Sequence, residues 1–93
     1  MIRQNRPIVS LGMVLATTNA LSQLPQHEIQ YALTRHRSGD WGDCCPADAS
    51  ANDAALQTGY RLLSVYHTAD GIKFWVLTVA DRSVTNVLLP EDY

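Results

Sequence analysis

Residues 60–89 read YRLLSVYHTADGIKFWVLTVADRSVTNVLL, and this stretch carries the strongest structural signal in the chain. Three runs rich in aromatic and β-branched residues, at 60–67, 72–80 and 84–89, are separated by short polar segments. The first polar segment contains Asp-Gly at 70–71, a dipeptide typical of tight hairpin turns. We therefore predict three antiparallel strands that follow one another as a meander.

A fourth strand is expected near the N-terminus. The run at 8–17 is apolar and rich in Val, Ile and Leu, with Gly12 as the position of a bulge. Thr17, Thr18 and Asn19 end this run with the hydroxyl and amide side chains that cap helix N-termini. A helical region should therefore begin directly after the strand.

Two helical segments should flank Pro25, because proline is excluded from a helix interior and favoured in the first turn. The segment before Pro25 is a short turn. The longer helix after it ends at Gly39, which suits the left-handed conformation of a helix C-terminus. Apolar positions in the longer helix recur at spacings of three and four and form one stripe. Members of the stripe are Ile29, Ala32, Leu33 and His36.

A third helical segment is expected between the loop at 38–46 and Gly59. Pro46 suits its first position, and the alanines that follow are strong helix formers. Asn52 and Asp53 should face solvent. The short turn before Pro25 is not counted as a helix. The expected element order is therefore β-α-α-β-β-β.

These elements predict a single small α+β domain over 1–93, with an antiparallel meander sheet and helices packed on one face. The first seven residues, 1–7, are polar and are expected to be flexible. A hydrophobic content of 46% and a charged content of 17% are typical of a globular chain. A domain of this length forms one modest core, so a homodimer would be a natural way to bury more surface.

Charge and cysteine usage limit the classes of partner. Seven Lys and Arg against nine Asp and Glu give a net charge of −2, which disfavours binding to nucleic-acid phosphates. No run of about 18 apolar residues is present, so we expect no membrane partner. The adjacent Cys44 and Cys45 are interpreted as two reduced thiols, because neighbouring cysteines rarely bridge each other. The cytoplasm is the compartment that fits this usage.

The first candidate site is the segment from His36 to Asp43, which places Asp40 and Trp41 just after a helix C-terminus. One interpretation is a C-cap loop in which Trp41 covers the edge of the core. The other is a binding loop in which His36 and Asp40 meet a ligand. The sequence leaves both open.

The second candidate site lies at the turn before the last strand. It contains Asp81, Arg82, Ser83 and Thr85. Arg82 offers a fork of donors suited to a carboxylate or phosphate, and the two hydroxyl side chains should point to one face of the strand. A salt bridge from Asp40 to Arg82, or from Asp81 to Arg61, explains the same residues without a ligand. No nucleotide-binding or zinc-binding spacing is present, so we expect no cofactor and no metal.

Two motifs carry a resemblance to a known family. Residues 35–42 fit R-H-x-x-G-D-W-G, and residues 80–93 fit A-D-R-S-x-T-x-x-L-L-P-E-D-Y. With the segment from Leu11 onward, they resemble a family of small uncharacterised proteins common on bacterial plasmids, phages and integrative elements, often labelled plasmid-related protein. The chain departs from the family at Cys44-Cys45-Pro46, where members usually carry a more acidic stretch.

The resemblance implies a mobile genetic element as the setting, and three functions compete there. The first is an accessory protein that binds a host- or element-encoded protein, in a host defence complex or in upkeep of the element. The second is a compact metal-independent endoribonuclease. In that enzyme His36 would be the general acid or base, Arg61 and Arg82 would hold phosphate, and Ser83 and Thr85 would orient it. The third is a nucleic-acid-binding accessory.

An exposed apolar patch would favour the first function. We expect such a patch beside the loop that contains Trp41, because contiguous apolar surface marks sites of protein interaction, and its absence there would count heavily against the first function.

Overall fold

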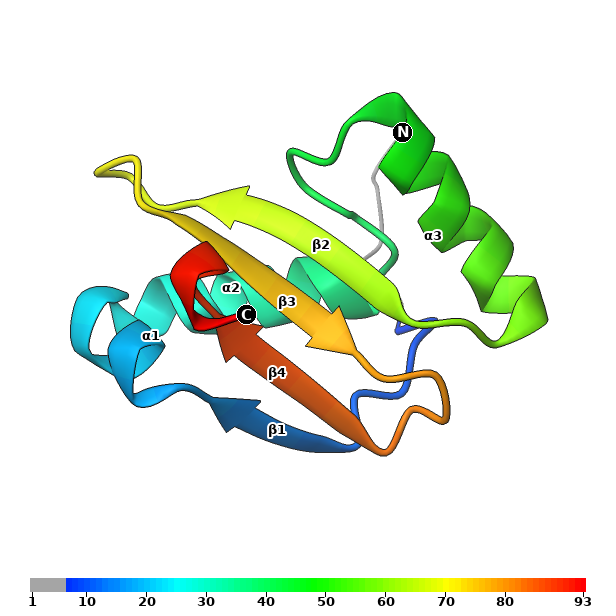
Figure 1. The fold of residues 1–93 in the computed structure, drawn as a ribbon, viewed down its shortest axis with the longest axis horizontal. Coiled ribbons are helices and arrows are strands. Elements are labelled where there is room, and N and C mark those ends of the chain that lie inside the picture. Colours follow the sequence, from blue (N-terminus) through cyan, green and yellow to red (C-terminus); the bar gives the residue numbers. More distant parts are fainter. Residues whose placement is uncertain (1–6) are drawn as a thin grey trace.

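A computed structural model describes residues 7–93, which form one four-stranded sheet with helices around it (Figure 1). Three strands follow one another as an antiparallel meander: β2 (Leu62–His67), β3 (Lys73–Thr78) and β4 (Val84–Leu88). The fourth strand, β1 (Met13–Ala16), lies on the far side of β4 and runs parallel to it. The sheet order is therefore β1-β4-β3-β2.

The predicted α+β class and the C-terminal meander are confirmed, but the sheet is mixed rather than wholly antiparallel. All three helices intervene between β1 and the meander, and a long crossover of this kind is what permits parallel pairing. β1 is also shorter than the predicted strand at 8–17. Gly12 has a φ of 63°, and a Cβ at this position would lie 2.2 Å from the carbonyl oxygen of Ser83. Gly12 therefore precedes the strand instead of forming a bulge inside it.

Three helices connect β1 to the meander: α1 (Thr18–Gln23), α2 (Gln26–Arg37) and α3 (Pro46–Thr58). The predicted order β-α-α-β-β-β is thus one helix short, because the short turn before Pro25 is a helix in its own right. Thr17 caps α1 as expected, since its hydroxyl accepts a hydrogen bond from the amide of Ala20.

The ends of the two longer helices also follow the sequence. Ser38 is the C-cap of α2, and Gly39 beyond it has a φ of 82°. Gly59 ends α3 with the same φ, and Pro46 occupies its first turn. The prediction that Asn52 and Asp53 face solvent is confirmed for Asp53 but wrong for Asn52, which is buried.

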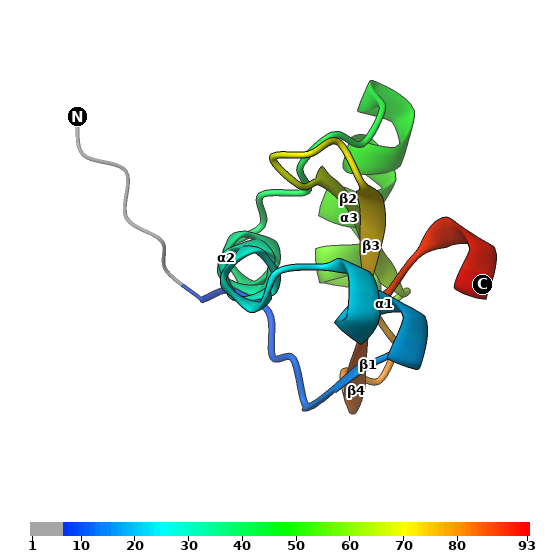
Figure 2. The ribbon, with the colours of Figure 1, turned by 90° about the vertical axis from the view of Figure 1, so that its left-hand side faces the viewer.

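The helices do not all lie on one face of the sheet. α2 packs across one face, and the short 3-10 helix η1 (Pro90–Asp92) lies on the opposite side (Figure 2). α3 lies beyond the edge strand β2 (Figure 1). The prediction of helices on a single face therefore holds only for α2.

The main core lies between α2 and the sheet. The predicted stripe of α2 is confirmed, because its four members are the buried residues of that helix. They meet the side chains of β2, β3 and β4 that point to the same face, including Tyr66, Phe74, Val76 and Val87. A smaller cluster of Val9, Trp41, Ala55 and Leu62 joins α3 to β2.

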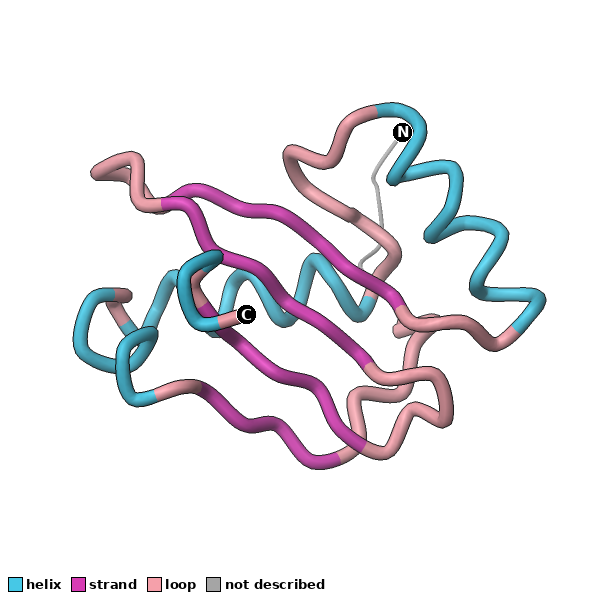
Figure 3. The backbone as a smooth tube through the Cα atoms, viewed as in Figure 1, coloured by secondary structure: helices cyan, strands magenta, loops and turns pink. Residues whose placement is uncertain are grey.

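The loop between α2 and α3 runs along the outer edge of β2 (Figure 3). Gly42 forms a parallel bridge with Val65, so the loop adds a short stretch of backbone pairing to the sheet. The segment 1–7 that was expected to be flexible lies outside the described residues, apart from Pro7.

Candidate functional site

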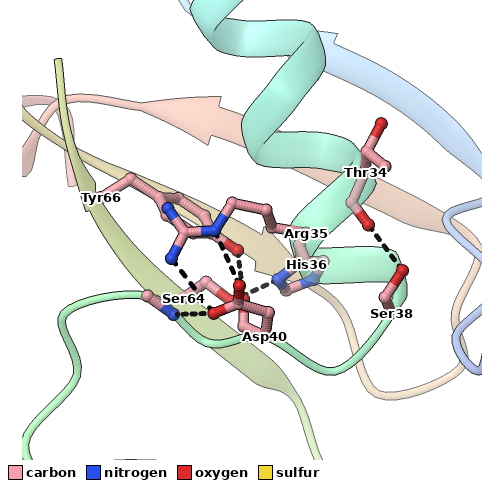
Figure 4. Close-up of polar contacts among 8 residues, drawn as sticks. Thr34, Arg35, His36, Ser38, Asp40, Ser64 and Tyr66 are labelled. Carbon is pink, nitrogen blue, oxygen red and sulfur yellow. Dashed lines mark hydrogen bonds and ion pairs between the residues drawn. The ribbon is translucent and has the colours of Figure 1, made fainter. Parts of the chain in front are cut away.

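His36, the first candidate for a catalytic role, lies in the interior between α2 and the sheet with none of its surface exposed. Its ring nitrogens lie 2.6 Å from the hydroxyl oxygen of Ser64 and 2.8 Å from that of Thr78. The contact with Ser64 can be followed in Figure 4. A residue from α2 is thus joined to both β2 and β3.

Proton positions along this chain of contacts follow from its far end. The carbonyl oxygen of Leu11 can only accept, so Thr85 donates its hydroxyl proton there over 2.7 Å. Thr78 must then donate to Thr85, also over 2.7 Å, and Nε2 of His36 donates to Thr78. The ring therefore carries a proton at Nε2. In its neutral state, Nδ1 accepts from the hydroxyl of Ser64.

The environment of His36 supports this neutral state. Burial, followed by the positive charge of Arg82, lowers the pKa of His36 to about 4 from its ordinary value of 6.5. Both nitrogens already have partners, and the ring has no exposed surface to meet a substrate. The arrangement joins a helix to three strands and an N-terminal loop, which is a structural task.

Asp40 closes the loop that follows α2. Its carboxylate accepts from Nε and Nη2 of Arg35, at 2.8 and 3.1 Å, and from the amide of Gly42 at 3.1 Å (Figure 4). The hydroxyl of Tyr66 donates to the Asp40 carbonyl, and the Arg35 guanidinium lies 4.9 Å from the Tyr66 ring centre. The hydrogen bond with Asp40 raises the pKa of Arg35. The alternative of an Asp40–Arg82 salt bridge is wrong, because Arg35 is the partner.

Trp41 is buried beneath this loop. Its indole Nε1 donates to Asp53 over 2.9 Å, and its ring meets the His36 ring edge-on at 5.6 Å. This is the position that the C-cap interpretation predicted for Trp41. The next position requires glycine, because a Cβ at residue 42 would lie 2.1 Å from the carbonyl oxygen of Val65. The G-D-W-G segment therefore builds a tight helix end against β2.

Arg82 is occupied by backbone carbonyl groups. It has a φ of 64°, and its guanidinium donates to the carbonyl oxygens of Tyr60 at 2.7 Å and Ala55 at 3.1 Å. These groups lie at and just after the end of α3, whose last turn has no basic residue. Arg82 thus supplies the cation that a helix C-terminus favours, from a turn elsewhere in the chain.

The other residues proposed for phosphate binding do not come together. Arg61 is exposed and forms no ion pair within residues 7–93. Asp81 accepts from the amide of Ser83 over 2.9 Å, so the alternative Asp81–Arg61 salt bridge is not formed. Hydrogen bonds from Ser83 lower the pKa of the Asp81 carboxyl. Ser83 is exposed while Thr85 is buried, so the two hydroxyls do not share a surface.

In the described part of the chain no three His, Cys, Asp or Glu side chains are grouped as metal ligands. Both cysteines are free thiols, and Cys44 donates to the carbonyl oxygen of Leu63 over 3.3 Å. Burial raises the pKa of the Cys44 thiol, which makes it a poor nucleophile. No helix in the described range is long and apolar enough to span a bilayer.

Four exposed apolar side chains lie together on β1 and α1, whereas Ile8, which is 56% exposed, lies beside Gly39 in the loop of Trp41. The exposed fractions are 63% for Met13, 43% for Val14, 47% for Leu15 and 64% for Leu21. β1 is at one edge of the sheet, whereas the loop of Trp41 pairs with the other edge strand, β2. The patch expected beside Trp41 is therefore at the opposite edge. The sequence revealed an apolar strand here but not that it lies at an edge.

A hollow runs between β1 and α2 beside this patch, and we call it the β1–α2 groove. It consists of one hollow of about 580 Å³ and another of about 280 Å³, which share Val14, Gln30 and Leu33 in their walls. The larger part also contacts Leu21 and Ile29. The lining of the larger part is mainly apolar, and the groove lies directly beside the exposed side chains of β1.

The chain was compared with protein-family models, curated proteins and solved structures, and none of them matches it.

Proposed function

We propose that this chain is a small accessory protein of a mobile genetic element that acts by binding another protein. The setting rests on the family resemblance of the 35–42 and 80–93 segments. In that setting the partner would belong to a host defence complex or to the machinery that maintains the element. No cofactor or metal is part of the proposal.

The observation that carries the proposal is the exposed apolar surface of β1 and α1. Met13, Val14 and Leu15 are consecutive, and each has more than two fifths of its surface exposed. Single exposed apolar residues are common, but a contiguous group beside an apolar groove is typical of an interaction site. Burying such a group against a partner yields about 25 cal/mol for each Å² of apolar area removed from water.

The second face of the sheet adds to this surface. On the face opposite α2, where η1 lies (Figure 2), five apolar side chains are half-buried. They are Leu63, Val65, Trp75, Leu77 and Val84. Tyr93, after η1, meets Trp75 edge-on at 5.6 Å. A partner that binds β1 would reach this face as well.

The endoribonuclease alternative lacks support in the geometry. A general acid or base must reach the proton that it transfers, and His36 is enclosed with both ring nitrogens occupied. Arg82 is engaged with carbonyl groups at the end of α3. The nucleic-acid-binding alternative requires a basic surface, and the net charge is −2.

The proposal is tested by photo-crosslinking in a host-cell lysate. A photo-reactive amino acid is introduced at position 15 of the full chain, and at position 60 as the matched control. Leu15 and Tyr60 are both exposed, but Tyr60 precedes β2 at the opposite edge of the sheet. We expect one protein to be crosslinked from position 15 and not from position 60, with mass spectrometry as the readout.

A double variant, Met13→Ser with Leu21→Ser, also carries the photo-reactive residue at position 15 and serves as the control for this surface. It should lose the crosslinked protein while its melting temperature stays within a few degrees, because both side chains are exposed. Recovery of RNA or DNA instead of protein, or equal crosslinking from both positions, would rule the proposal out.

A further inference from the structure

We propose that β1 accepts an extended segment of the partner protein as a fifth strand, antiparallel to β1. The segment would carry large apolar side chains at alternate positions and an acidic residue at its C-terminal end. This inference rests on the proposed function and adds the chemistry of the partner and its mode of binding.

The two edges of the sheet differ in whether their outward backbone groups are paired within the chain. At the β2 edge, the Asn52 side-chain amide donates to the carbonyl oxygen of Leu63 over 2.8 Å and accepts from its amide over 3.1 Å. The Val65 amide donates to the Trp41 carbonyl, and the Val65 carbonyl accepts from the amide of Asp43. The outward backbone groups of Leu63 and Val65, in the middle of β2, are therefore paired with other parts of the chain.

The β1 edge has no such cover. The amides of Met13 and Thr17 donate to Ser83 and Val87 on the β4 side, at 2.9 and 3.0 Å. By strand alternation the backbone groups of Val14 and Ala16 point away from β4, and no hydrogen bond within residues 7–93 reaches them from the outer side. An exposed apolar edge with unpaired groups is a template for another strand.

The exposure pattern of β1 favours a strand over a helix as the occupant. Val14 and Ala16 are paired with the buried Thr85 and Val87, so they point to the face that α2 covers. Leu15 and its neighbour Met13 point to the other face, and both are exposed. A helix in the β1–α2 groove would cover only the first face. A strand beside β1 contacts both faces and also satisfies the backbone.

The size of the groove favours a segment with large side chains over a second copy of this chain. The hollow beside β1 has a volume of about 580 Å³. A second β1, paired edge to edge, would offer only Val14 and Ala16 to that face, and these side chains are too small to fill it. Leu, Met or Phe at the corresponding positions of a partner would reach Ile29 and Leu33.

The charge of the groove indicates that the acidic residue of the segment lies at its C-terminal end. Arg37 is the one charged residue in its described lining, and it has no ion-pair partner within residues 7–93. It lines the smaller hollow together with Leu11, at the N-terminal end of β1. An antiparallel segment ends there with its C-terminal residues, so a carboxylate at that end would meet the guanidinium. Antiparallel pairing is also slightly more stable than parallel pairing.

The test begins with a displayed library of random twelve-residue peptides, selected against the full chain. We expect enriched peptides with apolar residues at alternate positions and Asp or Glu near the C-terminus. A synthetic peptide from the selection is then made in two versions, N-methylated at the odd or at the even positions. Only the version that blocks the amides facing β1 should lose binding, by at least tenfold in isothermal titration.

Three protein variants locate the bound peptide. Val14→Pro removes an outward amide that the fold does not use, whereas Val14→Thr keeps the amide and the side-chain shape. Binding should fall at least tenfold for the first and less than threefold for the second. In Arg37→Glu, a peptide with its acidic residue changed to Lys should bind more tightly than the original peptide.

Other results would overturn the inference while leaving the proposed function intact. Enriched peptides with a helical apolar period, or equal loss from both N-methylated versions, would exclude strand addition. Failure to enrich any peptide would also count against it. A concentration-dependent dimer that Val14→Pro abolishes would identify a second copy as the occupant. The proposed function is judged separately, by the crosslinking from position 15.

Discussion

A neutral His36 at the centre of the core makes stability depend on pH. Its pKa in the folded chain, about 4, lies below its ordinary value of 6.5, so the unfolded chain binds this proton more readily. The contribution of His36 is complete above pH 6.5 and is lost as the pH falls through 4. The shift corresponds to roughly 3 kcal/mol at most.

We therefore expect the free energy of unfolding to fall between pH 7 and pH 4.5, as measured by urea denaturation. His36→Gln retains one donor and one acceptor but does not titrate in this range, so it should show a smaller decrease. Equal pH dependence in the two proteins would contradict the neutral, buried state of the ring.

Thr85 ends the buried hydrogen-bond chain and offers a second test at the level of single residues. Thr85→Val removes the donor to Leu11 and the acceptor for Thr78 while nearly preserving volume. Two buried groups then lack partners, and we expect a loss of about 1–3 kcal/mol in the free energy of unfolding. Thr58→Val, at an exposed hydroxyl, should change it by less than about 0.5 kcal/mol.

The loop between α2 and α3 depends on one glycine where it meets β2. Gly42 has a φ of 71°, and a Cβ would lie 2.1 Å from a backbone oxygen of Val65. Gly42→Ala should therefore cost at least about 3 kcal/mol, from backbone strain and loss of the bridge. Gly71→Ala is the matched control, because its φ is 85° but its surroundings are open, and about 1 kcal/mol is expected. Similar losses in the two variants would show that the bridge contributes little.

The unequal strand edges can be compared directly by amide hydrogen exchange. The amides of Leu63 and Val65 donate to Asn52 and Trp41, so they should be protected close to the level of global unfolding. The amide of Val14 points outward and should exchange far faster under the same conditions. Comparable protection of all three amides would mean that the β1 edge is already covered in the isolated protein.

At the scale of the whole molecule, the C-terminal residues connect the two ends of the chain. The Asp92 carboxylate accepts from the hydroxyl of Thr17 at 2.6 Å and from the amide group of Asn19 at 3.1 Å. The hydrogen bond from Thr17 lowers the pKa of the Asp92 carboxyl. Asp92→Ala should therefore lower the melting temperature more than Glu91→Ala, and the difference should diminish at acidic pH. Equal shifts for the two variants would show that η1 merely rests on the sheet.

Local features of the fold could be predicted from the sequence because they depend on residues that are neighbours in the chain. The stripe of α2 repeats every three or four residues, and Thr17, Gly39 and Gly59 occupy helix ends for reasons of backbone geometry. The meander follows from three β-rich runs joined by short turns. The same reasoning placed Trp41 against the core, as one of two interpretations.

The remaining features depend on contacts between distant segments. His36 meets Thr78 across 42 residues, and Thr85 meets Leu11 across 74, so the polar residues of the candidate sites were recognisable but their partners were not. Asn52 looked exposed because helical periodicity does not reveal that α3 lies against the β2 edge.

Propensity, capping and hydrophobic period thus specified the strands, the helices and the buried face of α2, because these properties act over a few residues. The parallel register of β1 on β4, the closure of one sheet edge and the exposure of the other arise only when the layers assemble. The apolar sequence of β1 is equally compatible with a strand at the centre of a sheet and with a strand at its edge. Packing alone placed its side chains at the edge, where they are exposed.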